Sequence, residues 1–147
     1  MNATEFIHPE AAPSLRRFIA GLFGTDLVTD IRARSPHTLI APVDPAFDRL
    51  HWSFDQLLWN DDLVEPRFDL FEYLVIPGLH LGALPELETV RTVQGEPIRI
   101  GAGLVLGRHG VGRILATTTW EDSLVHVVDA CVLPSTVVDY IPEDRVT

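Results

Sequence analysis

The most constraining feature of this chain is the order of its segment types. Apolar residues at helical spacing fill the first half, and strand-like segments separated by tight turns fill the second half. Eleven prolines and ten glycines divide these segments, so that none is long. Helices grouped before strands are typical of an α+β domain. We therefore expect residues 1–147 to form one α+β domain with several short helices, and residues 1–12 to form an irregular N-terminal arm.

A regular spacing of apolar residues predicts the first helix. The residues that recur on one face after Ser14 are Leu15, Phe18, Ile19, Leu22 and Phe23. Residues three and four positions apart share a helix face, so this face is expected to pack against a core. A second short helix should end before Pro36, because proline disfavours helical backbone in the residue that precedes it.

Capping residues mark further helix starts. Asp44 stands before Pro45, which fits an N-cap followed by proline at the first helical position. Ser53 is followed three residues later by Gln56, which is the capping-box pattern. Another helix is expected to begin near Pro66.

Short apolar runs predict the strands. Residues 38–41 predict a buried strand that Pro42 ends. The turns at 94–97 and 107–110 each separate two strand-like segments, which is typical of β-hairpins. Residues 125–133 are rich in β-branched side chains and predict a long last strand.

Three segments in this order resemble the signatures of fasciclin domains. They are TLIAPVDPAF at 38–47, YLVIPG at 73–78 and VHVVDACVLP at 125–134. The residues that carry the resemblance are Thr38, Pro42, Asp44, Phe47, Tyr73, Pro77, Gly78, His126, Asp129 and Pro134. The resemblance implies a wedge-shaped β-sandwich with short helices packed around one end. It also implies a role in adhesion or ligand binding.

Three of these positions carry polar groups in apolar surroundings. The Tyr73 hydroxyl needs a hydrogen-bond partner if the ring is buried. His126 and Asp129 lie in an apolar segment, so they must either point outward or be hydrogen-bonded. We expect His126 to be a hydrogen-bonded structural histidine.

The chain departs from the family pattern at positions linked to integrin adhesion in animal members. Leu74 stands where a histidine usually follows the tyrosine, and Arg113 stands where an aspartate is usual. Integrin binding is therefore not expected. Residues 117–123 predict a lengthened turn, on which Trp120 is either an exposed contact residue or folded back on the core.

The charge balance excludes some classes of partner. The formal net charge is -10, whereas binding to nucleic acid or to an anionic membrane surface needs a basic face. No stretch approaches the roughly 20 apolar residues of a membrane-spanning helix. The first residues lack the pattern of a secretory signal, which predicts a cytoplasmic protein, or an extracellular or periplasmic one if a signal has been removed.

No motif for catalysis, phosphate binding or metal binding is present in the sequence, so no cofactor and no metal are expected. His51, His80 and Tyr73 are weak catalytic candidates. His51 lies four residues before Asp55, but the cap at Ser53 places it ahead of the helix.

Aromatic residues are the remaining candidates for a ligand-binding site. Trp52 and Trp59 are seven residues apart, so on a helix they would share one face. They either pack into the core or line an apolar pocket, and Trp120 is the third ligand-binding candidate.

Three hypotheses follow for the function. The first is a non-catalytic binding module that recognises a protein partner or a small apolar ligand. The alternative is a small cytoplasmic cyclase or isomerase of secondary metabolism, in which an apolar pocket holds a flexible substrate in a reactive shape. The third is a structural protein that forms a homodimer.

Overall fold

The computed structural model describes residues 15–34, 36–50 and 52–138. The helices are α1 (Arg16–Gly24), α2 (Leu27–Arg34), η3 (Asp44–Arg49), α3 (Phe54–Trp59), η4 (Asp61–Leu63), α4 (Val64–Tyr73) and α5 (Ser135–Val138). The strands are β1 (His37–Pro42), β2 (Val75–Pro77), β3 (Glu88–Arg91), β4 (Pro97–Gly101), β5 (Leu104–Leu106), β6 (Val111–Trp120) and β7 (Ser123–Val128). The expected N-terminal arm at 1–12 lies outside these residues.

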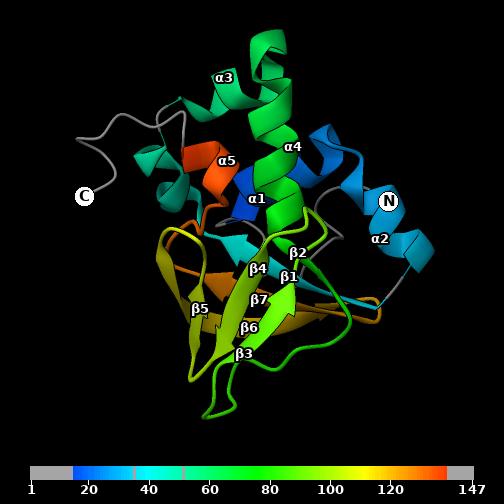
Figure 1. Ribbon diagram of the computed structural model, residues 1–147. Coiled ribbons are helices and arrows are strands. Elements are labelled where there is room, and N and C mark those ends of the chain that lie inside the picture. The colour runs from blue at the N-terminus through cyan, green and yellow to red at the C-terminus, as the bar shows by residue number, and fades with distance from the viewer. Residues whose placement is uncertain (1–14, 35, 51, 139–147) are drawn as a thin grey trace.

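All seven strands form one mixed sheet in the order β2-β1-β7-β6-β5-β4-β3. Strand β1 pairs with β7 in parallel, and every other pair is antiparallel. The sheet curls until its two ends meet, where the Val93 amide donates to the Val75 carbonyl at 2.8 Å. The helices gather at one end of the curled sheet (Figure 1).

The three segments that resemble fasciclin signatures meet in one hydrophobic cluster. Leu39 of β1, Val75 of β2 and Val127 of β7 all belong to it. Helices α1 and α4 contribute Phe18 and Phe71, which are fully buried. The early helices and the late strands therefore share one core, as the α+β prediction requires.

The prediction for the inward face of α1 was right except at its end. Leu15, Phe18, Ile19 and Leu22 are buried, but Phe23 is 41% exposed. The helix ends at Gly24, and the backbone amide of Thr25 closes it by donating to the Gly21 carbonyl. At about 100° per residue, Phe23 falls beyond Ile19, at the margin of the stripe that Phe18, Ile19 and Leu22 form.

The prediction that Asp44 caps its own helix was wrong. The N-cap of η3 is Val43, and Asp44 is its first helical residue. The Asp44 carboxylate instead accepts a hydrogen bond from the backbone amide of Arg17 at 2.9 Å, in the first turn of α1. It therefore satisfies an otherwise orphaned donor of a helix 27 residues away in sequence. The expected cap at Ser53 is confirmed, because its hydroxyl accepts from the Gln56 amide.

The predicted turn at 117–123 was wrong. Strands β6 and β7 remain paired as far as Trp120 and Ser123, which leaves only Glu121 and Asp122 in the turn. Trp120 is 4% exposed, so it is a core residue and not a side chain on a lengthened loop. The guanidinium carbon of Arg32, on α2, lies over the Trp120 ring, 5.5 Å from its centre.

The last strand is shorter than its composition predicted. Strand β7 ends at Val128, and Asp129 is exposed beyond it. The Asp129 carboxylate accepts a hydrogen bond from the Arg113 amide at 2.8 Å. Of the segment 129–133, Leu133 forms only an isolated bridge with His109.

Candidate functional site

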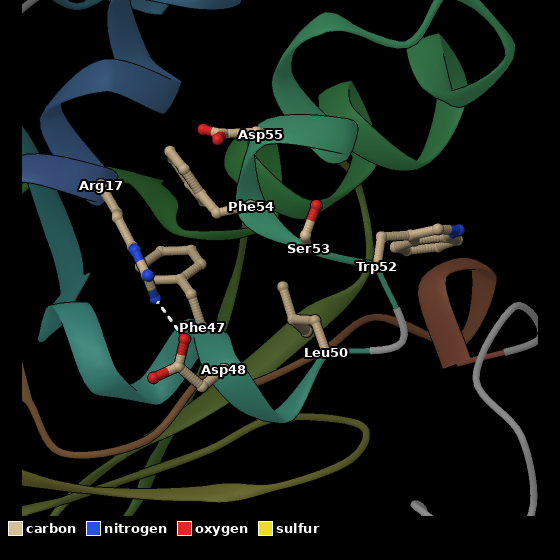
Figure 2. A pocket seen from close by; sticks show the side chains of 8 residues that line it. All are labelled: Arg17, Phe47, Asp48, Leu50, Trp52, Ser53, Phe54 and Asp55. Atoms are coloured by element: carbon tan, nitrogen blue, oxygen red, sulfur yellow. Dashed lines mark hydrogen bonds and ion pairs between the residues drawn. The ribbon is translucent and has the colours of Figure 1, made fainter.

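A pocket of about 360 Å³ opens between α1, η3 and the start of α3. The residues that line it are Arg17, Phe47, Asp48, Leu50, Trp52, Ser53, Phe54 and Asp55. Figure 2 shows Arg17 and Asp48 at one end of this row of side chains and Trp52 at the other. The pocket therefore has a charged end and an aromatic end.

The floor of the pocket belongs to the hydrophobic core. Phe47 is 1% exposed and meets Phe54 edge to face, with ring centroids 5.2 Å apart. Phe47 also stacks on the buried ring of Phe71, with ring centroids 6.1 Å apart. Leu50 is also buried, and Trp52 is half-buried against the core. These contacts hold the apolar wall of the pocket in place.

The charged end is organised around Arg17. Its guanidinium donates to the Asp48 carboxylate at 2.7 Å and to the Asp44 carbonyl at 2.8 Å, and it lies 5.6 Å from the centre of the Phe54 ring. Asp48 and Asp55 are exposed. The pocket thus contains two carboxylates and one cation, and the cation already has an anionic partner. This arrangement suits a group that donates hydrogen bonds or carries positive charge.

Two helix caps, one long-range and one local, position these side chains. The Asp44 carboxylate ties η3 to the first turn of α1, which places Arg17 beside Asp48. The Ser53 hydroxyl starts α3 immediately after Trp52, so that Phe54 turns inward against Phe47.

The structure separates the two tryptophans that the sequence grouped. Helix α3 begins at Phe54, so Trp52 precedes it and the seven-residue helical spacing does not apply. Trp52 lines the pocket, whereas Trp59 does not and is 75% exposed at the end of α3. The candidate His51 lies outside the described residues. The sequence did not predict that Arg17 and Asp48 belong to this pocket. Their contact spans 31 residues, and no local sequence pattern indicates it.

Tyr73 is held in the interior by backbone groups. It is the last residue of α4, and its ring is fully buried. Its hydroxyl donates to the Pro97 carbonyl at 3.0 Å and accepts from the Arg108 amide at 2.8 Å. Burial raises the pKa of this hydroxyl. The expected hydrogen-bond partners are therefore present.

His126 is the hydrogen-bonded structural histidine that the sequence predicted. One ring nitrogen is 2.8 Å from the Thr117 hydroxyl, and the other is 2.8 Å from the His80 carbonyl. Burial lowers the pKa of His126, which favours the neutral ring. The His80 amide in turn donates to the buried Thr38 hydroxyl, which donates to the Gly78 carbonyl. This network links β1 and β7 to the loop after β2.

Both ring nitrogens of the His80 side chain also have polar partners. Its ring contacts the Glu88 carboxylate at 3.3 Å and the Pro77 carbonyl at 3.0 Å. Neither His80 nor Tyr73 lines the pocket beside Trp52. Their catalytic roles stay predictions.

Comparison with known proteins supports the fold. The sequence matches no family model and no curated protein. The structure is similar to that of a FAS1 domain pair from the insect cell adhesion molecule Fasciclin I, with a TM-score of 0.59 at 16% sequence identity. The similarity covers 81% of this chain and 45% of that one. The fold is fasciclin-like. The predicted α+β architecture is confirmed, and its sandwich-like layers belong to one continuous, curled sheet.

Across 15–34, 36–50 and 52–138, no three His, Cys, Asp or Glu side chains gather in a way that could hold a metal ion. Within the same residues, no helix has the length and apolar character needed to span a bilayer. The expected lack of nucleic-acid binding, the compartment and the homodimer stay predictions from the sequence.

Proposed function

We propose that this fasciclin-like chain is a non-catalytic binding module that takes a peptide segment of a protein partner into the pocket beside Trp52. The observation that carries the proposal is the pairing of a preformed aromatic wall with two exposed carboxylates in one pocket. The segment would carry an apolar side chain for the Trp52 end and a basic side chain for Asp48 and Asp55.

The two ends of the pocket favour an elongated occupant. Trp52 and the Arg17–Asp48 pair stand apart, with Leu50 between them (Figure 2). A peptide can reach both ends with neighbouring side chains. The same helix that supplies Phe54 ends at Trp59, whose 75% exposure adds a second aromatic surface. Tryptophan is enriched among the residues that dominate protein–protein binding.

The charge of the whole chain favours a basic partner. A net charge of -10 attracts cationic surfaces and increases their rate of encounter. The rim carboxylates of Asp48 and Asp55 would then fix the orientation of the bound segment. Binding should accordingly weaken as salt is added.

Selection from a random peptide library displayed on phage tests this proposal. We expect the selected peptides to combine a Lys or Arg with a nearby aromatic or aliphatic residue. Trp52→Ala should weaken their binding about tenfold or more, and Asp48→Asn with Asp55→Asn should weaken it and reduce its salt dependence. Leu115→Ala is the matched control, because Leu115 is 55% exposed on β6 and lies outside the pocket.

Two outcomes would overturn the proposal. One is a set of selected peptides that bind the Trp52→Ala protein as tightly as the parent while its thermal unfolding is unchanged. The other is a library that yields no binder specific for the folded chain. If the selected peptides do bind at Trp52, the Trp59→Ala variant shows whether the bound surface also extends along α3.

A further inference from the structure

A second pocket, of about 320 Å³, lies where the two ends of the curled sheet meet. Helix α2, β1, β2 and the residues after β3 enclose it, and it shares no lining residue with the pocket beside Trp52. Its apolar lining residues are Leu27, Ile31, Val75, Pro77 and Val93. Asp30 and Arg34 of α2 and His37 of β1 complete it.

His37 is the unusual member of this lining. It is 5% exposed, and its Nδ1 atom has no hydrogen-bond partner among the described residues. A buried polar atom without a partner costs free energy, and nearly all such atoms in proteins are paired. Elsewhere in the same sheet His126 has partners for both ring nitrogens. The unpaired nitrogen of His37 therefore calls for an explanation.

A hydrogen bond and strand pairing fix the backbone around His37. The His37 amide donates to the Ser123 hydroxyl at 3.0 Å, and His37 pairs with Pro77 across β1 and β2. Burial lowers the pKa of the imidazole, which keeps it neutral near pH 7. A neutral imidazole has one nitrogen that donates and one that accepts.

We propose that this pocket binds a small, uncharged apolar molecule that carries a hydroxyl group, with the hydroxyl hydrogen-bonded to the His37 ring. A hydroxyl both donates and accepts, so it suits either tautomer of His37. The apolar walls take the hydrocarbon part of the ligand, and a volume of about 320 Å³ limits it to a single ring or a short branched chain.

The charges at the pocket also select against an ionised ligand. Asp30 and Arg34 are exposed and of opposite sign, so together they add no net charge to the lining. Transfer of an ion among the apolar side chains of Leu27, Ile31 and Val75 would carry a desolvation cost.

Three probes of one shape test the proposal by NMR titration of the full chain: 4-ethylphenol, ethylbenzene and 4-ethylbenzoate. We expect 4-ethylphenol to shift the His37 ring nitrogen signals and the amides of α2, β1 and β2 saturably. Ethylbenzene lacks the hydroxyl and should bind about fivefold more weakly, which corresponds to one neutral hydrogen bond. The charged 4-ethylbenzoate should not bind.

Three variants keep the test independent of folding problems. His37→Leu should remove the preference for 4-ethylphenol over ethylbenzene. Val93→Trp changes a residue that is 41% exposed at the edge of the pocket, and its larger side chain should block all binding while His37 stays in place. Trp52→Ala should leave the titration unchanged, so that failure of this proposal and failure of the peptide site can be told apart.

The proposal is overturned if ethylbenzene binds as tightly as 4-ethylphenol, or if 4-ethylphenol shifts no signal of His37. It is also overturned if Val93→Trp folds and binds 4-ethylphenol with unchanged affinity.

Discussion

Gly21 of α1 lies directly against the aromatic ring of Phe71 of α4. A Cβ atom at position 21 would overlap the ring carbons Cε1 and Cζ of Phe71. The ring cannot easily retreat, because it is fully buried and stacks on Phe47. The distance between these two helices therefore depends on the missing side chain of a glycine.

Gly21→Ala is expected to lower the free energy of unfolding by about 1–3 kcal/mol, the usual cost of overpacking a core. Urea denaturation followed by circular dichroism measures it. Gly24→Ala in the same helix is the control. The nearest atom to its new Cβ is a Leu58 methyl at 3.5 Å, an ordinary contact, and alanine favours helix, so no loss of stability is expected. Equal losses in both variants would contradict this account.

Asp44→Ala is expected to lower the free energy of unfolding by about 1 kcal/mol, because the Arg17 amide in α1 loses its cap. Asp44→Asn keeps an acceptor oxygen and should lose less. Asp48→Ala removes an exposed ion pair from the same arginine and should cost less than about 1 kcal/mol. If Asp44→Ala is no more costly than Asp48→Ala, the capping role is wrong.

Tyr73→Phe is expected to destabilise the chain by about 1–2 kcal/mol, since the Pro97 carbonyl and the Arg108 amide both lose a partner. The phenylalanine ring fills the same space, so the near-ultraviolet circular dichroism of the other aromatic residues should be preserved. Thermal and chemical unfolding curves give the loss. An unchanged midpoint would show that water replaces the hydroxyl at no cost.

Stability should fall as the pH drops from 7 to 5. Burial lowers the pKa of His37 and of His126 in the folded chain, whereas an unfolded histidine titrates near 6.5. The unfolded chain then binds more protons, so the stabilisation present above pH 6.5 is lost as the pH falls below it. Around His37, Asp122 opposes this shift and Arg34 adds to it.

Urea midpoints at intervals of half a pH unit test the sign of this dependence. The His37→Phe variant lacks one of the two buried imidazoles. Its urea midpoint should therefore fall less between pH 7 and 5, but should still fall. A midpoint that rises over the same interval would mean that the folded chain holds these rings protonated.

Local signals in the sequence predicted the parts of the fold that depend on neighbouring residues. The cap at Ser53, the two hairpins and the order of helices before strands were all visible as short patterns. The last turn was not, because its length depends on how far the strands on either side stay paired. Pairing of β6 with β7 and the cover from Arg32 over Trp120 make it a tight hairpin instead.

The candidate sites were less accessible to sequence reasoning because their contacts are long-range. Trp52 was found as an aromatic beside a cap, but its grouping with Trp59 assumed a helix that begins later. Asp44 looked like a cap for its own helix and serves α1 instead. Nothing in the residues near His37 indicates that α2 and the segment after β3 enclose it.

The parallel pairing of β1 with β7 has a consequence for synthesis of the chain on the ribosome. The His37 amide donates to the Ser123 hydroxyl across 86 residues of sequence, so β1 lacks one of its two neighbouring strands until β7 has been made. Contacts of such separation slow folding and leave a nascent strand edge unprotected. Ribosome-bound chains that stop before β7 should accordingly recruit chaperones more strongly than chains that stop after it.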